Sequence, residues 1–287
     1  VDRFNDIQNL GYEAHRWNDD WGYLNRGGQE NEVLNARVNG YHKPQFALND
    51  YWQLSERTNL ATSFYISTGK GYGSRYDGTS NPRVSETYVD TAGVERSVKT
   101  SLNWDYLWDS NANNSQPVTY AADQIAYDVD AQAWIDTLHE FGDPIVVGND
   151  TIVGGRSRSV IENAHNEHFW TGILSTLRHE VNDRVSLMAG VDARYYSGKH
   201  FTRVNNLLGG DFYLQSFSSS DGYGVNPDYA LMAQPGDKVD YDDIGRVQYA
   251  GGFAQAEYKD DRFSLFGAGT ISYTTYRRID PYKYFRY

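Results

Sequence analysis

The chain of 287 residues contains no cysteine, which excludes a disulfide framework and a thiolate metal site. No apolar run approaches the 18 or so residues that a membrane helix needs, so the sequence argues against a helical membrane protein. Cationic residues are also scarce. Lysine and arginine total 26 against 38 acidic residues, giving a net charge of −12. Without a basic stripe to neutralise phosphates, we expect no nucleic-acid partner.

Aromatic residues, in contrast, are abundant, with 24 tyrosines, 12 phenylalanines and 7 tryptophans, although the mean hydropathy is only −0.68. The sequence has a repeated pattern of two alternating segments joined by a very short polar turn. Such turns are predicted at residues 55–58, 181–184 and 259–261. The connections between these hairpins, residues 75–162 and 203–246, are far longer than ordinary loops. Short turns at one end and long loops at the other are typical of a transmembrane β-barrel.

The alternation supports the same interpretation. Residues 185–195 place Val185, Leu187 and Val191 on one face, and Ser186, Asp192 and Arg194 on the other. The apolar stretch from Phe263 to Tyr273 would rise about 25 Å at a tilt of roughly 40°, which matches the lipid-facing band of an outer-membrane barrel. A soluble β-sandwich or propeller with long insertions would also alternate and remains the alternative.

We therefore predict an all-β fold, a transmembrane antiparallel β-barrel with short periplasmic turns and long extracellular loops. Strands are predicted near residues 4–16, 41–54, 59–74, 166–181, 185–202, 247–259 and 262–276, and extracellular loops near 17–40, 75–162 and 203–246. Within the longest loop, residues 130–141 predict a short helix. Because single-chain barrels have at least eight strands, we expect residues 1–287 to be a partial barrel domain, with any plug domain absent from this chain.

Several sequence segments in the hairpins resemble the barrel of TonB-dependent outer-membrane receptors of the type with a carboxypeptidase-regulatory-like domain ahead of the plug. The resemblance covers nearly the whole chain and is carried by residues 41–45 (YHKPQ), 190–200 (GVDARYYSGKH), 206–211 (NLLGGD) and 252–258 (GFAQAEY).

This resemblance implies a barrel of about 22 strands in the outer membrane of a Gram-negative bacterium. It further implies a plug inside the barrel and uptake of a specific solute, driven through the TonB energy-coupling complex. Outer-membrane lipid, lipopolysaccharide and a surface lipoprotein are the other expected partners. No plug residue or TonB-contact residue can be assigned, because the matching segments are absent. A passive porin or a surface-binding barrel is the alternative function.

We expect no enzymatic activity and predict no catalytic, cofactor-binding or metal-binding residue, because no nucleophile, base and orienting acid stand at a recognisable spacing. The sequence NAHNEH at residues 163–168 holds two histidines and a glutamate, but on a strand His165 and Glu167 would point away from His168, so a zinc site is disfavoured.

Two groups of residues are the candidates for contacts. Asp192, Arg194 and Tyr196 are predicted to line the lumen, where an ion pair that holds the wall to a plug is favoured over a substrate contact. Trp104, Tyr106, Trp108 and Trp134 could stack on a ligand from the longest loop, although packing within that loop is favoured. The sequence does not identify the solute.

Overall fold

The computed structural model describes residues 18–78, 81–89, 92–112, 156–215, 229–230 and 232–285, with the short strands at 118–119, 138–139, 145–147, 150–152 and 223–225. The fold is all-β, with one short helix in this part of the chain, and nearly every strand pair is antiparallel. No helix in the described ranges is long and apolar enough to cross a membrane.

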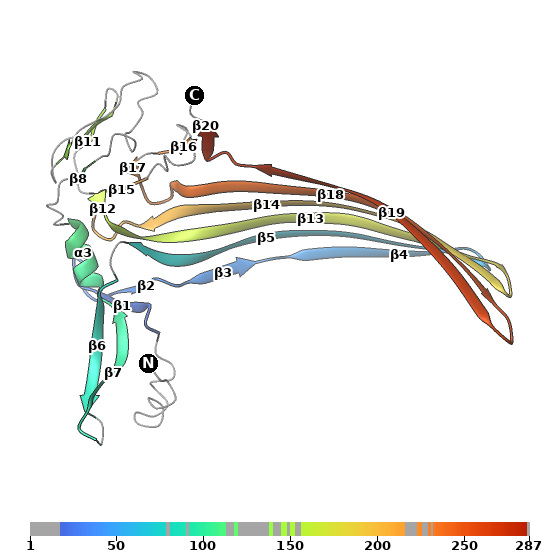
Figure 1. The fold of residues 1–287 in the computed structure, drawn as a ribbon, viewed down its shortest axis with the longest axis horizontal. Helices are drawn as coiled ribbons and strands as arrows, with labels where there is room; N and C mark the ends of the chain where they lie inside the picture. Colours follow the sequence, from blue (N-terminus) through green and yellow to red (C-terminus); the bar gives the residue numbers. More distant parts are fainter. Residues whose placement is uncertain are drawn as a thin grey trace.

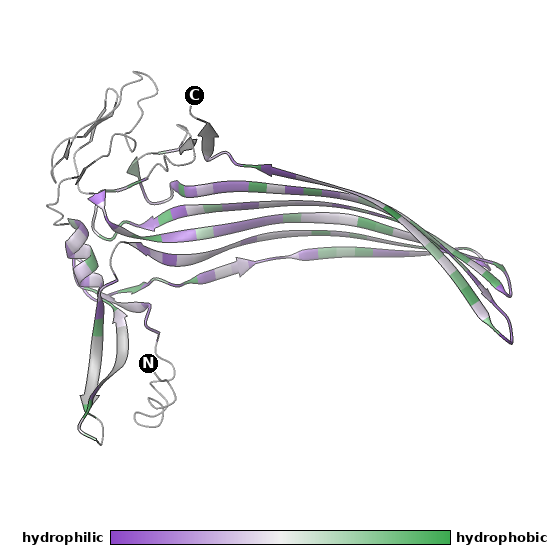
Figure 2. Ribbon diagram, viewed as in Figure 1, coloured by the Kyte–Doolittle hydropathy of each residue, from purple (hydrophilic) through white to green (hydrophobic). Residues whose placement is uncertain are grey.

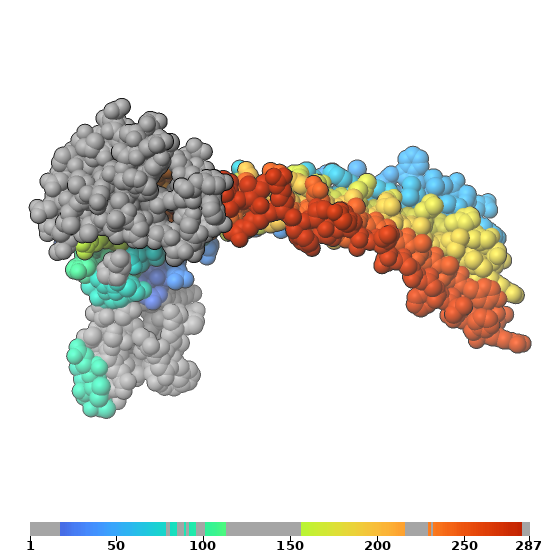
Figure 3. Space-filling model, turned by 45° about the horizontal axis from the view of Figure 1, so that its top comes forward, coloured from blue at the N-terminus to red at the C-terminus, as the bar shows by residue number. Residues whose placement is uncertain are grey.

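A single sheet of seven strands dominates the molecule (Figure 1). Its strands are β3 (Asn39–His42), β4 (Gln45–Ser55), β5 (Thr58–Gly78), β13 (Ser159–Asn182), β14 (Val185–Asn206), β18 (Lys238–Lys259) and β19 (Ser264–Ile279). The order is β19-β18-β14-β13-β5, after which β4 and β3 pair with successive parts of β5. In the described residues the sheet is open, so it forms a curved slab rather than a closed cylinder (Figure 3).

Three tight turns lie together at one end of this sheet (Figure 1). Asn182 and Asp260 each begin a turn in which the side-chain oxygen accepts two backbone N–H groups, at 2.9 and 3.0 Å for Asn182 and at 2.8 and 3.0 Å for Asp260. Asn and Asp favour turns for this reason. The hydrogen bonds from the backbone N–H groups of Arg262 and Phe263 lower the pKa of Asp260. The sequence predicted the first two turns correctly, whereas the third, predicted at 259–261, lies at residues 260–263.

The opposite end of the sheet carries a second assembly, here called the loop-end lobe, which contains the short strands and the helix (Figure 1). Its elements are β1 (Trp21–Leu24), β2 (Glu32–Asn35), β6 (Arg83–Val89), β7 (Glu95–Leu102), α3 (Trp104–Ala112), β8 (Val118–Thr119), β9 (Leu138–His139), β10 (Ile145–Val147), β11 (Asp150–Ile152), β12 (Arg156–Ser157), β15 (Phe212–Leu214), β16 (Tyr223–Val225), β17 (Met232–Ala233) and β20 (Lys283–Phe285). Asn103 caps α3, since its side-chain oxygen accepts the backbone N–H of Tyr106 at 3.1 Å.

The hydrophobic core lies at this loop end rather than along the sheet. One cluster joins Leu24, Leu34, Trp104 and Leu107 to Ile161 and Leu208. A second cluster joins Val160, Val204, Leu207, Ala233 and Val239. The long strands therefore enter the lobe at their loop ends and are held there by packing, whereas their turn halves have no buried hydrophobic core in the described residues.

The strands are longer than predicted, and always at the loop end. β13 begins at Ser159 rather than near 166, and β18 begins at Lys238 rather than near 247. The predicted strand 41–54 is two strands, because Pro44 lacks a backbone N–H and interrupts the ladder. The predicted strand 4–16 lies outside the described residues. So does the predicted helix 130–141 apart from Leu138–His139, which form strand β9.

Candidate functional site

The register of the long sheet aligns the apolar side of every strand. Leu187 pairs with His179 and Ala256, and Val191 pairs with Ser175 and Gly252. Since directly paired residues point to the same side of a sheet, the apolar residues of six strands share one surface, here called the apolar face. Its larger members are Phe46, Leu48, Trp52, Leu54, Leu60, Phe64, Ile66, Ile173, Leu177, Leu187, Val191, Tyr258, Leu265, Ile271 and Tyr273.

Most of these side chains are exposed. Ile271 is 80% exposed, Leu265 68% and Val191 59%. A monomeric soluble protein rarely exposes a contiguous apolar surface larger than a few hundred Å², so a surface of this extent indicates contact with a partner or with lipid. Figure 2 shows hydrophobic residues recurring toward the turn end of β4, β18 and β19, and hydrophilic ones concentrated toward the loop end.

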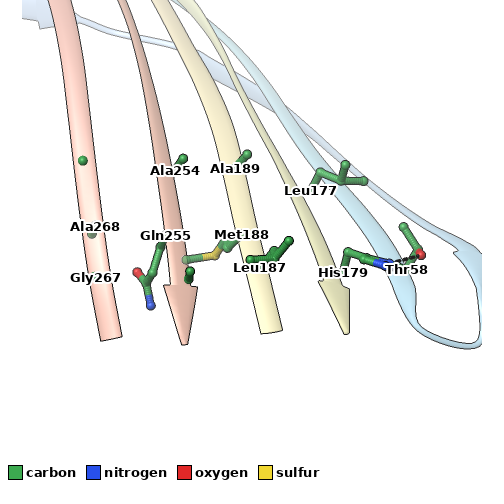
Figure 4. A pocket seen from close by; sticks show the side chains of 12 residues that line it. Thr58, Leu177, His179, Leu187, Met188, Ala189, Ala254, Gln255, Gly267 and Ala268 are labelled. Atoms are coloured by element: carbon green, nitrogen blue, oxygen red, sulfur yellow. Dashed lines mark hydrogen bonds between the residues drawn. The ribbon is translucent and has the colours of Figure 1, made fainter. Parts of the chain in front are cut away.

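Polar groups on the apolar face bond to neighbours on the same face. Thr62 Oγ1 lies 2.9 Å from Ser175 Oγ, and Thr58 Oγ1 lies 2.9 Å from His179 Nδ1 (Figure 4). Asp50, on the edge strand, accepts a hydrogen bond from the indole N–H of Trp52. Each polar side chain named here thus has a partner that reduces its cost in an apolar surrounding.

The apolar face is hollowed near the turns, where small residues replace large ones. Ala189, Ala254, Ala256, Gly267 and Gly269 line a shallow hollow of about 760 Å³, beside Leu177 and Leu187 (Figure 4). The hollow is open and carries no cluster of convergent polar groups, so its lining provides a concave apolar surface rather than a catalytic site.

The opposite surface, here called the polar face, carries all three residues that were predicted to line the lumen. Arg194 Nε donates to Asp192 Oδ1 at 2.9 Å, and a second nitrogen of the guanidinium also contacts this carboxylate. The Arg194 guanidinium lies 5.3 Å from the centroid of the Tyr249 ring. The two charges therefore neutralise each other within the wall. Tyr196 Oη lies 2.6 Å from His168 Nδ1.

Aromatic rings lie flat on the polar face, over glycines. A Cβ atom at Gly172 would overlap the Tyr65 ring, and one at Gly190 would overlap the Phe253 ring. Glycine is therefore required at these two positions by close approach rather than by backbone conformation.

The two histidines of the 163–168 segment separate as the strand geometry requires. His165 stacks on Phe201 at 4.9 Å between ring centroids, while His168 lies beside Tyr196 and His200. Among the described residues, no group of three or more His, Asp or Glu side chains could hold a metal ion.

The tryptophans predicted as possible ligand contacts lie mainly in the lobe core. Trp104 is 1% exposed, and Trp108 packs against the first core cluster. Tyr106 is 54% exposed on α3, so of these three it alone offers most of its side chain to a ligand. Trp134 lies outside the described residues.

A buried acidic cluster at the base of the lobe was missed by the sequence analysis. Glu162 is fully buried, and one of its oxygens accepts from Arg75 at 2.9 Å. Arg75 also donates to Asp240 at 3.1 Å. Burial, followed by the charge of Asp240, raises the pKa of Glu162 to about 7 despite this pairing. Asp240 lies in a bulge of β18, opposite Phe201 and Thr202 of β14, and no local sequence signal predicts this bulge.

No protein-family model matches the chain, and neither a curated protein nor a solved structure is significantly similar to it.

Proposed function

We propose that this chain is a sector of an outer-membrane β-barrel and serves a TonB-dependent transporter that takes up a specific solute into the periplasm. The observation that carries the membrane assignment is the apolar face, which is continuous across six strands, exposed, and free of a hydrophobic core of its own. The remaining strands of the cylinder would be supplied outside the described residues.

The height of the apolar face supports lipid rather than a protein partner. On β18 it extends from Tyr258 beside the turn to Gln248, which pairs with Tyr195 of β14. The centroid of the Tyr195 ring lies 6.1 Å from that of Phe169. Ten residue steps at about 3.3 Å, tilted by roughly 40°, rise about 25 Å. Aromatic residues at both limits of the band match the two girdles of such barrels.

In this assignment, the polar face lines the lumen, the three tight turns lie in the periplasm and the loop-end lobe lies outside the cell. The proposal of transport rests on the resemblance of the hairpin segments to TonB-dependent receptors, and on the loop-end lobe, which has its own packed core. Residues that capture a solute are commonly carried on loops held by a rigid scaffold. A passive pore or a surface-binding barrel would use the same wall.

Energy dependence separates these possibilities. Cells that express the full-length protein carrying this chain would be given labelled siderophores, glycans, peptides and vitamins, with and without collapse of the proton gradient. We expect one class to be taken up with saturation, and this uptake to stop when the gradient collapses. Flux that persists without the gradient and rises linearly with concentration would identify a passive pore.

A further inference from the structure

Four cationic side chains lie on the loop-end side of the apolar face, in the two residue rows that follow its aromatic limit. Arg246 and Arg277 are in the first row, and Lys70 and Lys199 are in the second, on the same side of the sheet as Leu187 and Val191. We call these four residues the basic belt. They span the five adjacent strands from β5 to β19, roughly 19 Å at the usual strand spacing.

Within the described part of the chain, acidic side chains offset the charge of the belt only in part. Arg246 and Arg277 are directly paired across β18 and β19, an arrangement of like charges that destabilises a sheet. All four side chains are exposed, and none forms an ion pair with another described residue. Glu167, opposite both lysines, is the one acid in these two rows of the described sheet. A local excess of positive charge in a chain of net charge −12 indicates that an anion completes this surface.

Two hollows adjoin the belt on the same face. One, of about 380 Å³, is lined by Lys70 and Glu167 together with His42, Tyr72 and His165. The other, of about 450 Å³, lies on the turn side of the belt. Its lining includes Phe64, Ile173, Ala193, Tyr195 and Gln248, and is largely apolar. The belt therefore adjoins one hollow whose lining includes titratable side chains and, on its turn side, a second hollow that is largely apolar.

We propose that the basic belt binds the phosphate groups of a phosphorylated glycolipid in the outer leaflet, with an acyl chain in the apolar hollow beside Tyr195. This inference rests on the proposed membrane function, because the apolar face must be in lipid for the belt to lie at the head-group level. Arginine and lysine bind phosphate oxygens through charge-assisted hydrogen bonds, and cations near a membrane surface favour anionic lipids. Lipopolysaccharide, whose lipid A anchor carries phosphates, has this chemistry.

The test uses the full-length protein in phosphatidylcholine vesicles that contain increasing amounts of fluorescent lipid A, with energy transfer from tryptophan as the readout. The variants are R246Q/R277Q and K70Q/K199Q. The control is R184Q/R262Q, which removes two arginines at the turn end of the sheet, the end proposed to face the periplasm. We expect each belt variant to raise the half-saturating fraction of lipid A by about tenfold, and the control to leave it unchanged.

Two further arms identify the source of the phosphate. Dephosphorylated lipid A should bind the wild-type protein as weakly as lipid A binds the belt variants, and inorganic phosphate in the buffer should not displace the labelled lipid. Equal binding of wild-type and belt variants, equal binding of dephosphorylated lipid A, or displacement by millimolar phosphate would each overturn the proposal. If the wild-type protein does not insert into any vesicle, the membrane function itself fails, and this outcome is distinct from the others.

Discussion

At the scale of single residues, Glu162 shows how burial changes the chemistry of a side chain. Asp77, Glu162 and Asp240 lie around the guanidinium of Arg75, so three carboxylates share one close cation. Ionising all three carboxylates in a site that excludes water would cost free energy that one cation does not offset. Burial consequently raises the pKa of Glu162 to about 7 and also raises the pKa of Asp240.

This shift predicts a pH dependence with a definite sign. The folded state holds a proton on Glu162 that the unfolded chain releases, so the contribution to stability is complete below pH 4.5, the ordinary value. It is lost as the pH rises to about 7, and its size is on the order of 3 kcal/mol. Glu162→Gln, which imitates the protonated form, should equal wild type at pH 4 and exceed its stability at pH 8 in reversible unfolding. Glu167→Gln is the control, and parallel pH curves for wild type and Glu162→Gln would contradict the account.

Neighbouring residues on opposite faces of one strand offer a second test. Leu177 is 40% exposed on the apolar face, whereas Thr176 points to the polar face at nearly the same depth. Leu177→Arg should reduce the free energy of folding into lipid by about 2–4 kcal/mol, because it places a charge in hydrocarbon. Thr176→Arg should cost clearly less. Equal losses for the two variants in reversible folding into lipid vesicles would remove the distinction between the faces.

At the scale of elements, the sequence specified the hairpins better than the loops. Alternation and turn residues are local signals, and the three turns, to within two residues, and the two faces of β14 agree with the structure. The loop ends of the strands were assigned to loops; residues 238–246, for example, are rich in acids, and their apolar alternation is limited to Val239 and Tyr241. Their pairing depends on long-range contacts with β14 instead.

The helix α3 is a case in which a signal existed and was missed. Trp104, Leu107 and Trp108 have helical spacing, and Asn103 is a favourable N-cap. The position of α3 against the sheet depends on Asn111, whose amide donates to the carbonyls of Ser159, Leu207 and Leu208 at 2.8 to 3.0 Å. No pattern within the helix predicts these partners, because they lie 48 to 97 residues away. The acidic cluster around Glu162 was unpredictable for the same reason.

The absence of cysteine makes the two ends of the sheet directly testable. Asp183 lies in a tight turn with its side chain 92% exposed, and Tyr106 lies on α3 with 54% exposure. In intact cells, an impermeant thiol reagent should label Tyr106→Cys and leave Asp183→Cys unlabelled until the outer membrane is opened. The reverse pattern would invert the proposed orientation, and labelling of both in intact cells would show that the sheet does not span the membrane.

At the scale of the whole molecule, the described chain combines a packed lobe with a sheet that has no hydrophobic core along its turn half. In water such a sheet would expose apolar side chains on six neighbouring strands. In the proposed membrane barrel, lipid would cover this face, the strand ladder would satisfy the backbone, and the polar face would line the interior. One physical requirement thereby explains the exposed residues, the tight turns and the position of the core.

The central claim is that the apolar face contacts hydrocarbon, and single-cysteine scanning of β14 tests it most directly. Each residue from Ser186 to Ala193 would carry a fluorophore in the protein inserted into vesicles, with a quencher attached to the lipid chains. The account predicts strong quenching at Leu187, Ala189, Val191 and Ala193, and weak quenching at Ser186, Met188, Gly190 and Asp192. Quenching without this period of two, or quenching at none of the eight positions, would contradict it.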